Sequence, residues 1–235
     1  MARITHEAWK VYGNVFDNYT NRLIFKLTSE NHIEKLQSPV SIGKEANVFT
    51  AKTIDGKDII AKIYRLESCN FNKMYDYIKS DQRFENLKRQ RRKVIFAWVM
   101  REYQNLMKAR EVGVNVPRPI TVKHHILMLE MIGDKTPAPK LKDVAIEKDL
   151  AEKTILSMKK MYAAGLVHGD LSEYNILIHN NTPYFIDFSQ GTTRKDPNYE
   201  EYWERDIKNM SKFFCKRGLK ISEEDIKKKI GYTPS

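Results

Sequence analysis

The stretch that decides the fold is Val-His-Gly-Asp-Leu-Ser-Glu-Tyr-Asn-Ile-Leu at positions 167–177, continued by Tyr-Phe-Ile-Asp-Phe at positions 184–188. It places two acids and an amide, Asp170, Asn175 and Asp187, at the ends of short apolar runs. Their oxygen atoms are the hard ligands that magnesium prefers. Two residues that bind a metal, together with one carboxylate aimed at a nucleophile, form the layout of a kinase-type phosphoryl-transfer site. We therefore expect Asp170 to orient or deprotonate the nucleophile, and Asn175 and Asp187 to hold the metal.

The apolar runs next to these residues predict how they meet. Residues 176–178 and 183–186 flank the turn at 179–182, a pattern typical of a β-hairpin. Such a hairpin would fix Asn175 close to Asp187.

The spacing also matches the kinase pattern His-x-Asp-x-x-x-x-Asn, and Asp187 stands where protein kinases have the Asp of Asp-Phe-Gly. Ser189 replaces the usual glycine. The competing interpretation is a solvated loop that happens to carry two acids and an asparagine. Four matching positions and a flanking hairpin argue against it.

Upstream, Ser-Ile-Gly-Lys-Glu-Ala-Asn-Val-Phe at 41–49 predicts a strand, a tight turn and a second strand. Gly43 permits a backbone conformation that other residues resist, and the small Ala46 lets main-chain groups approach a phosphate. By itself this signal is weak, because the common kinase loop has three glycines and this one has a single glycine.

A turn at 55–56 leads into residues 58–64, a strand that carries Lys62 in an apolar setting. Burying such a lysine is costly unless a carboxylate and a phosphate pair with it. We expect the carboxylate to be Glu102, in a helical run from about residue 84 to 111. The alternative is a strand-edge lysine whose ammonium reaches solvent. The position of Lys62 between the glycine turn and the catalytic stretch disfavours that alternative.

Taken together, these segments resemble the RIO atypical protein kinases, from about Tyr12 to the last helix. The resemblance is carried by Gly-Lys-Glu-Ala-Asn-Val (43–48), Ile-Ala-Lys (60–62), Arg-Glu-Tyr-Gln-Asn-Leu (101–106), Leu-Glu-Met-Ile-Gly (129–133) and His-Gly-Asp-Leu-Ser-Glu-Tyr-Asn (168–175). The first 40 residues resemble the type-one branch, whose short helical extension leads directly into the loop, and leave no room for the winged-helix domain of the type-two branch.

The resemblance implies an α+β, bilobal protein-kinase-like fold with a small β-rich N-lobe and a mostly helical, truncated C-lobe. It implies ATP as the nucleotide with Mg²⁺, or Mn²⁺ in its place. Leu129 would gate the adenine pocket, where the Glu130 carbonyl and the Ile132 amide would meet the adenine edge. The expected nucleotide-binding residues are Gly43, Lys44, Glu45, Ala46, Asn47, Val48, Lys62, Glu102, Leu129, Glu130 and Ile132.

The resemblance also implies a route for the reaction. The RIO family hydrolyses ATP through a phospho-aspartate at the metal-binding Asp, which would be Asp187 here, so Asp170 and Asp187 are the expected catalytic residues. Only a short segment separates Asp187 from the next expected helix near Tyr199, so a peptide-docking surface like that of typical protein kinases is not expected. The sequence leaves open whether the phosphoryl group passes to Asp187 or to a serine.

Composition predicts the class and location of the protein. The 235 residues are 41% hydrophobic, enough for one core split over two lobes. No apolar run approaches the length that spans a bilayer, and the first residues lack the apolar stretch of a secretory signal, so we expect a cytoplasmic protein without a membrane partner. Cys69 and Cys215 are too few and too far apart for a disulfide framework or a zinc site, so we expect reduced thiols.

The net charge of +11 suggests a polyanionic partner. Lys88, Arg89, Arg91, Arg92 and Lys93 form a basic cluster that follows several aromatic residues, a mixture suited to phosphate contact and base stacking. The RIO resemblance implies the small ribosomal subunit precursor and its rRNA as partners, and no DNA is expected. The Lys-Lys-Lys run at 227–229 is interpreted as a solvated helix face.

The expected organisation has three parts: a helical extension at 1–38, a nucleotide-binding N-lobe at 39–132 and a catalytic C-lobe at 133–235. Residues 68–83 are expected to form a flexible connection. Further helices are expected at about 146–164, 199–217 and 222–230. In the extension, the candidate packing positions are Leu23, Leu27 and Leu36.

Three functions compete. The first is a RIO type-one kinase or ATPase that acts in maturation of the small ribosomal subunit. The second is another small phosphotransferase, of the KEOPS or aminoglycoside-kinase type, which also uses His-Gly-Asp; the loop at 43–48 and the short C-terminal part argue against it. The third is a weakly catalytic RNA-binding scaffold with a kinase fold. A full set of catalytic residues argues against a dead site, although not against slow turnover.

Overall fold

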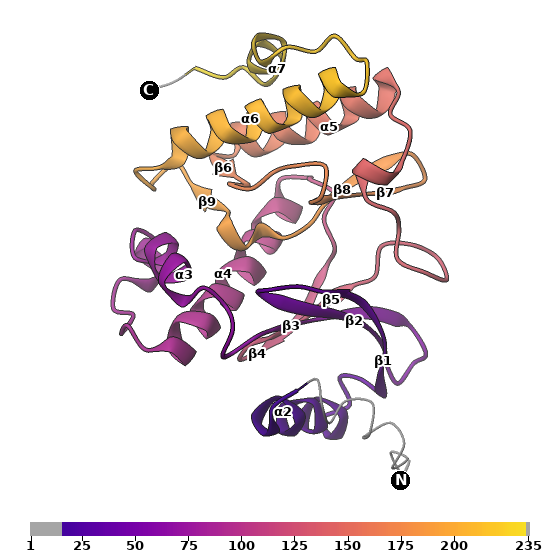
Figure 1. The fold of residues 1–235 in the computed structure, drawn as a ribbon, viewed down its shortest axis with the longest axis vertical. Coiled ribbons are helices and arrows are strands. Elements are labelled where there is room, and N and C mark those ends of the chain that lie inside the picture. The colour runs from indigo at the N-terminus through magenta and orange to yellow at the C-terminus, as the bar shows by residue number, and fades with distance from the viewer. Residues whose placement is uncertain (1–15, 234–235) are drawn as a thin grey trace.

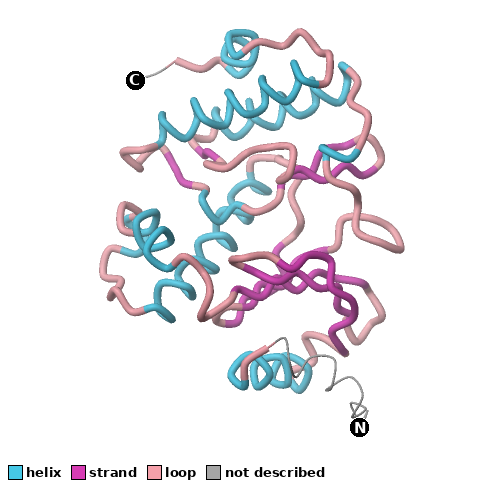
Figure 2. The backbone as a smooth tube through the Cα atoms, in the orientation of Figure 1, coloured by secondary structure: helices cyan, strands magenta, loops and turns pink. Residues whose placement is uncertain are grey.

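The computed structural model describes residues 16–233, so the first part of the predicted helical extension, residues 1–15, lies outside the described residues. Figure 1 shows a β-sheet with a helix on its outer face near the N-terminus, and a helical part that contains the C-terminus. Figure 2 shows the same division, with most of the strands gathered in the first part. This arrangement is the predicted bilobal α+β, kinase-like fold.

The N-terminal lobe is built on a five-stranded antiparallel sheet with the order β1-β2-β3-β5-β4. The strands are β1 (Lys35–Ile42), β2 (Ala46–Lys52), β3 (Asp58–Tyr64), β4 (Pro119–Lys123) and β5 (Ile126–Glu130). Burial alternates along β2, as the period of two in a strand requires. Because β1 begins at Lys35, the sheet reaches into the range predicted as the helical extension; the domain boundaries at 38 and 132 stay predictions.

Helix α2 (Asn18–Ser29) covers one face of the sheet. The side chain of Asp17 caps it by accepting the backbone N–H of Thr20 at 2.7 Å. The three predicted packing positions, Leu23, Leu27 and Leu36, are all buried in the cluster between helix and sheet. The other face of the sheet packs against the long helix of residues 91–111 and lines the cavity between the lobes.

The segment at 68–83, predicted as a flexible connection, contains two helices instead. They are α3 (Phe71–Ile78) and the short 3-10 helix η1 (Gln82–Phe84). Asn70 caps the first through the N–H of Lys73, and Asp81 caps the second through the N–H of Arg83. Local side-chain to backbone bonds of this kind create turns that hydrophobic periodicity does not reveal.

The long helix α4 (Arg91–Glu111) begins at Arg91 rather than near residue 84, because η1 and a turn occupy the residues before it. Its buried residues, among them Val94, Ile95, Leu106 and Ala109, belong to one core cluster, and the helix contacts β4 and β5 of the sheet as well as residues 188–190 of the C-terminal lobe. Helix α4 therefore belongs to both lobes, and Figure 1 shows it running between them.

The C-terminal lobe consists mainly of helices with two short two-stranded sheets. Its elements are η2 (Leu141–Asp143), α5 (Lys148–Ala163), β6 (Leu166–Val167), β7 (Ile176–His179), β8 (Thr182–Phe185), η3 (Phe188–Gln190), β9 (Thr192–Thr193), α6 (Tyr199–Lys216) and α7 (Glu223–Ile230). The predicted hairpin is present as β7 and β8, and its turn contains Asn180 and Asn181 with φ of 49° and 53°. Positive φ at both central positions is typical of a tight hairpin turn.

Two predicted helix ends are confirmed. Gly165 follows α5 with φ of 65°, the left-handed conformation of a C-terminal cap. Ser222 and Asp225 form a capping box at the start of α7. Within residues 16–233, no helix is both long and apolar enough to cross a membrane. Cys69 and Cys215 are free thiols.

Candidate active site

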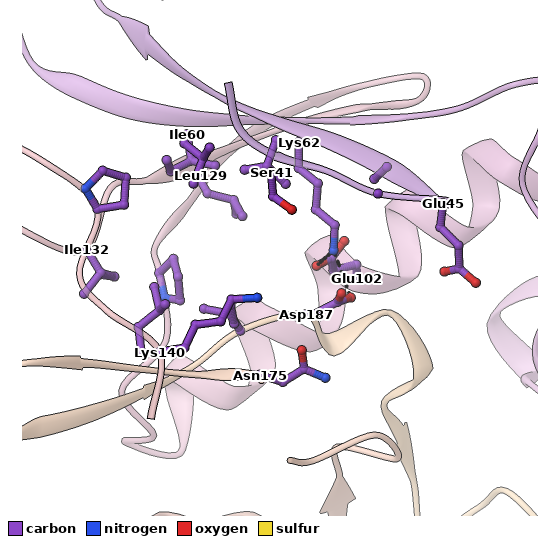
Figure 3. Close-up of a pocket in the computed structure, with 18 of the residues that line it drawn as sticks. Ser41, Glu45, Ile60, Lys62, Glu102, Leu129, Ile132, Lys140, Asn175 and Asp187 are labelled. Carbon is purple, nitrogen blue, oxygen red and sulfur yellow. Dashed lines mark hydrogen bonds and ion pairs between the residues drawn. The ribbon is translucent and has the colours of Figure 1, made fainter. Parts of the chain in front are cut away.

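A cavity of about 410 Å³ lies between the sheet and the C-terminal lobe. Of the residues predicted to bind nucleotide or metal, it is lined by Gly43, Lys44, Glu45, Ala46, Val48, Lys62, Glu102, Leu129, Glu130, Ile132, Asn175 and Asp187. Figure 3 shows apolar side chains, Ile60, Leu129 and Ile132, on one side and charged side chains on the other. The cavity thus has an apolar part suited to a ring and a polar part suited to phosphates.

Lys62 of β3 lies between two carboxylates in the polar part. Its Nζ is 2.8 Å from Oε1 of Glu102 and 2.8 Å from Oδ1 of Asp187. Figure 3 shows the three side chains pointing toward one another. Tyr64, two residues further along β3, donates its hydroxyl to Oε2 of Glu102 at 2.5 Å. Both oxygens of the fully buried Glu102 therefore have partners, as a buried charge requires.

These contacts fix the charge states of the site. Burial alone would lower the pKa of Lys62, but the neighbouring Asp187 and Glu102 outweigh it and raise that pKa. Burial alone would raise the pKa of Asp187, but the Lys62 ammonium lowers it to about 2. Burial raises the pKa of Glu102. Lys62 and Asp187 consequently form a charged pair at neutral pH.

The carboxylate of Asp187 is held by its own loop. Asp187 has φ of 63°, a left-handed conformation that few side chains tolerate and that Asp adopts more readily than most. Ser189 donates its hydroxyl to Oδ1 of Asp187 at 2.8 Å, so the serine in place of the usual glycine restrains the aspartate.

Burial lowers the pKa of His168 to about 4, so its ring is neutral, and its Nε2 lies 2.9 Å from the carbonyl of Ile186.

Asn175 and Asp170 form a second pair on the facing side. Nδ2 of Asn175 donates to the backbone carbonyl of Asp170 at 2.8 Å and to its Oδ2 at 3.2 Å. The amide oxygen of Asn175 is thereby left as the atom that can bind a metal. Burial, and then the charge of Asp187, raise the pKa of Asp170, which favours a role as a base.

The donor set fits a magnesium ion that arrives with phosphate. Mg²⁺ usually takes one or two protein oxygens and completes its shell with water and phosphate. One carboxylate and one amide, from Asp187 and Asn175, meet that requirement. Among residues 16–233 no group of three or more His, Cys, Asp or Glu side chains is placed to hold a metal.

The loop of Asp170 is supported from below by Asp206 of α6. Its two oxygens accept the backbone N–H groups of Gly169 and Leu171, each at 2.8 Å, on either side of Asp170. Arg205 donates to the carbonyl of Gly169. Burial raises the pKa of Asp206 to about 7. These two bonds hold the backbone on either side of Asp170 in place.

Comparison with known proteins agrees with this geometry. The family model of the RIO domain matches residues 47–228. The RIO-type serine/threonine-protein kinase Rio1 of Haloferax volcanii is 41% identical over 225 residues, which cover 94% of this chain and 77% of that relative. Rio1 of Methanocaldococcus jannaschii is 39% identical and covers 95% of this chain and 78% of its own length. Human RIO1 is 33% identical over 88% of this chain, but only 38% of that longer protein is matched.

The chain belongs to the RIO kinase family. The Rio1 relatives place this RIO kinase in the predicted type-one branch. Among solved structures, the Rio2 kinase-ADP/Mg²⁺-phosphoaspartate complex from Chaetomium thermophilum is similar in fold, with a TM-score of 0.67 and 22% identity over 91% of this chain and 67% of that one. This similarity supports the kinase-like fold.

Two predictions about the glycine loop of this RIO kinase need correction. The φ of Gly43 is not positive, so a special conformation is not why glycine stands there. A Cβ at Gly43 would lie 2.8 Å from the carbonyl oxygen of Ala46, which accepts the N–H of Gly43 at 3.0 Å; close approach requires the glycine. Asn47 does not line the nucleotide cavity. It is buried and lines a smaller cavity of about 150 Å³ on the opposite face of β2, because its neighbours Ala46 and Val48 face the nucleotide cavity.

Helix α4 also anchors the loop that follows Asp187. Arg101 is fully buried and donates through Nε to the carbonyl of Gly191 at 3.1 Å. Asn105, one turn later, donates to the carbonyls of Phe188 and Gly191 at 2.9 and 2.6 Å. One helix therefore holds Lys62 through Glu102 and holds the loop of Asp187 through the flanking residues.

Sequence reasoning missed several residues of the site. Tyr64 could have been found, since it lies two positions from Lys62 and so on the same face of the strand. Ser189 was noted only as a departure from glycine. Asp206 and Lys140, which also lines the cavity, carry no local signal. They reach the site only through tertiary packing.

The basic cluster lies on the turn before α4 and on its first turn. All five residues are exposed, and none pairs with a carboxylate among residues 16–233. Arg89 and Arg91 lie over the rings of Tyr75 and Phe71, with 5.3 and 5.5 Å to the ring centroids. These two rings, which belong to the aromatic residues before the cluster, are thus in contact with arginines, and the same guanidinium groups donate to Asn72 and to the carbonyl of Glu67.

Proposed function

We propose that this RIO kinase transfers the γ-phosphoryl group of ATP in a Mg²⁺-dependent reaction, as a serine/threonine-protein kinase and as an ATPase. The observation that carries the proposal is the ammonium of Lys62, 2.8 Å from both Glu102 and Asp187 in the polar part of the cavity. A lysine held this way can pair with phosphate while a metal ion satisfies the aspartate. The curated Rio1 relatives carry the name of serine/threonine-protein kinases.

ATP would place its adenine in the apolar part of the cavity. The gate would be Leu129, and the adenine edge would meet the carbonyl of Glu130 and the amide of Ile132. Its phosphates would follow the loop at 43–48, whose Gly43 turn allows the backbone to come close. Asn175 and Asp187 would hold Mg²⁺, which supplies the positive charge that neutralises the phosphate oxygens.

We further propose that Asp187 accepts the phosphoryl group. Its low pKa of about 2 keeps it ionised, which is the form that can attack phosphorus. Oδ of Asp187 would form a bond to the γ-phosphorus as the bond to the bridging oxygen breaks and ADP leaves. Water would then attack that phosphorus while Asp170 takes its proton, the bond between phosphorus and Oδ of Asp187 would break, and inorganic phosphate and the free carboxylate would result. The related Rio2 kinase, which is described as an ADP/Mg²⁺-phosphoaspartate complex, supports this route.

The test is the chemistry of the label. The protein is incubated with Mg²⁺ and ATP labelled at the γ-phosphate, then quenched in acid and treated with hydroxylamine. The proposal expects label that survives acid, is lost to hydroxylamine and is absent from Asp187→Asn. Label that resists hydroxylamine would indicate transfer to serine or threonine, and would contradict the covalent route while leaving the kinase activity in place.

The partner we propose is the small ribosomal subunit precursor and its rRNA, in the cytoplasm. The RIO resemblance and the five exposed cations of the basic cluster support it. Measuring ATP hydrolysis with and without small-subunit precursor particles tests this partner. An RNA-binding scaffold without catalysis would bind the particles and show no turnover. The RIO family match disfavours the KEOPS-type and aminoglycoside-kinase alternatives.

A further inference from the structure

The nucleotide cavity contains a cation to which neither the catalytic motifs nor the proposed reaction gives a role. Lys140 lies in the segment between β5 and η2 and lines the cavity. Figure 3 shows its side chain extending into the cavity, with the nitrogen on the side of Asn175 and Asp187. Lys62, by contrast, reaches the same region from the sheet.

The backbone of Lys140 is fixed against the hairpin that carries Asn175. Lys140 forms a β-bridge with Leu177, and the carbonyl of the preceding Pro139 accepts the N–H of Ile178 at 2.9 Å. The next residue, Leu141, is fully buried. The root of the side chain is therefore held in a constant position relative to Asn175, and only the flexible stem of the lysine adjusts.

Within the described part of the chain, the ammonium of Lys140 has no partner. Among residues 16–233 no carboxylate lies within salt-bridge distance of it, and it donates no side-chain hydrogen bond. Its half-buried stem directs the charge into a cavity rather than out along the surface. A cation so placed can bind an anion that enters the cavity.

The charges of the site show why such an anion needs further cations. Lys62 is already shared by two carboxylates, Glu102 and Asp187, and Asp170 is near enough for the charge of Asp187 to raise its pKa. Taken by themselves, these four side chains carry an excess of negative charge, which would repel a polyphosphate. A bound Mg²⁺ would offset part of this negative charge. A second ammonium on the C-lobe side would offset more.

We propose that Lys140 is a nucleotide-binding residue that pairs with the phosphates from the C-lobe side, opposite Lys62. This inference rests on the proposed function, because it requires a nucleotide in the cavity. The ammonium of Lys140 contacts the phosphates of the nucleotide, and not the ribose or the base. Lys140 thus selects nucleoside di- and triphosphates over nucleosides.

Calorimetric titration of the protein with ADP plus Mg²⁺ and with adenosine tests the assignment. A charge-assisted contact predicts that Lys140→Met weakens ADP binding about ten-fold. Adenosine binding should be unchanged, and Lys140→Arg should bind ADP nearly as well as the wild type. Lys142→Met is the matched control: this lysine is two residues away, pairs with Asp143 at 3.4 Å and does not line the cavity. Thermal melting shows whether each variant is folded.

Each outcome decides the matter. An equal loss of ADP and adenosine binding in Lys140→Met would move the contact to the ribose and overturn the inference. No loss for either ligand would overturn it as well. If Lys62→Met weakens ADP binding while Lys140→Met does not, only the inference about Lys140 falls. If the wild-type protein binds neither ligand, the proposed function falls and the inference with it.

Discussion

The hydroxyl of Tyr64 donates a hydrogen bond to Oε2 of Glu102 at 2.5 Å, while Lys62 occupies the other oxygen of the same carboxylate at 2.8 Å. Glu102 is fully buried, so its charge depends on these two donors. Burial raises the pKa of Tyr64 far above its ordinary value, and the phenol remains a donor at any physiological pH. Tyr64 therefore fixes the rotamer of the carboxylate that orients Lys62.

Replacing this phenol tests its role. Tyr64→Phe should lower the free energy of unfolding by about 1.5–3 kcal/mol, the usual contribution of a hydrogen bond to a charged group. It should also reduce ATP turnover, because Glu102 becomes free to rotate. Urea denaturation and steady-state kinetics measure both effects. Tyr184→Phe, which removes a hydroxyl from a half-buried ring of β8, is the control. Equal stabilities for the two variants would contradict the role of Tyr64.

The anchor between α4 and the Asp187 loop gives a second prediction. Asn105→Ala removes one of the donors to each of the carbonyls of Phe188 and Gly191, which keep only the N–H of Gly191 and Nε of Arg101 as partners. We expect a loss of about 1–3 kcal/mol in the free energy of unfolding. We also expect kcat to fall more than the affinity for ADP, because the loop of Asp187 loosens. Arg110→Ala, an exposed position of the same helix, should change neither. A stable Asn105→Ala variant with normal kcat would refute the anchor.

The raised pKa of Asp206 predicts the direction in which the free energy of unfolding changes with pH. Its pKa is about 7 in the folded protein and lies near 3.8 when the residue is unperturbed. The folded state therefore binds more protons between these values, and the contribution of Asp206 to stability falls as pH rises from about 4 to about 7. Above that range it is constant.

The measurement is the free energy of unfolding of the wild type minus that of Asp206→Asn, because other titrating groups cancel in the difference. The difference should decrease from pH 4.5 to pH 7, by roughly 1.4 kcal/mol for each pH unit at most, and should be level between pH 7.5 and 8.5. A difference that is level across the whole range would show that Asp206 stays ionised in the folded protein.

The basic cluster predicts a salt effect on RNA binding. Lys88→Gln with Lys93→Gln removes two exposed cations whose side chains contact no carboxylate among residues 16–233. The slope of log affinity against log salt should become shallower by about 0.7–0.9 for each cation that meets a phosphate. The control is Lys227→Gln with Lys229→Gln, since Lys227 pairs with Glu204 at 2.9 Å and Lys229 pairs with Glu152. If filter binding gives the same slope for both variants and the wild type, the basic cluster does not contact RNA.

Much of the fold was predictable because its signals are local. The β7–β8 hairpin has two apolar runs around a turn, and the C-terminal cap at Gly165 and the capping box at Ser222 each depend on a few adjacent residues. The pairing of Lys62 with Glu102 was predictable for a different reason. A buried lysine requires a carboxylate, and the long helix supplies one in a helical pattern.

The missed features depend on contacts between distant residues. Helix α3 has only eight residues, and it is held by the cap at Asn70 and by packing of Met74 and Ile78 against the core rather than by a long periodic pattern. Asp206 meets Gly169 across 37 positions of sequence. Asn47 was misassigned because a motif names consecutive residues, whereas a strand directs alternate side chains to opposite faces.

The most direct test of the central claim, that Lys62 and Asp187 form a Mg²⁺-dependent phosphoryl-transfer site, is release of ADP from ATP by the wild type, Lys62→Met and Asp187→Asn. Each substitution keeps the approximate shape of its side chain, and circular dichroism verifies the fold. The control is Asp134→Asn, which removes a highly exposed carboxylate between β5 and η2. We predict that turnover requires Mg²⁺ and falls at least about a hundred-fold in Lys62→Met and Asp187→Asn, while Asp134→Asn matches the wild type. Near-normal turnover in a folded Lys62→Met or Asp187→Asn protein would contradict the account.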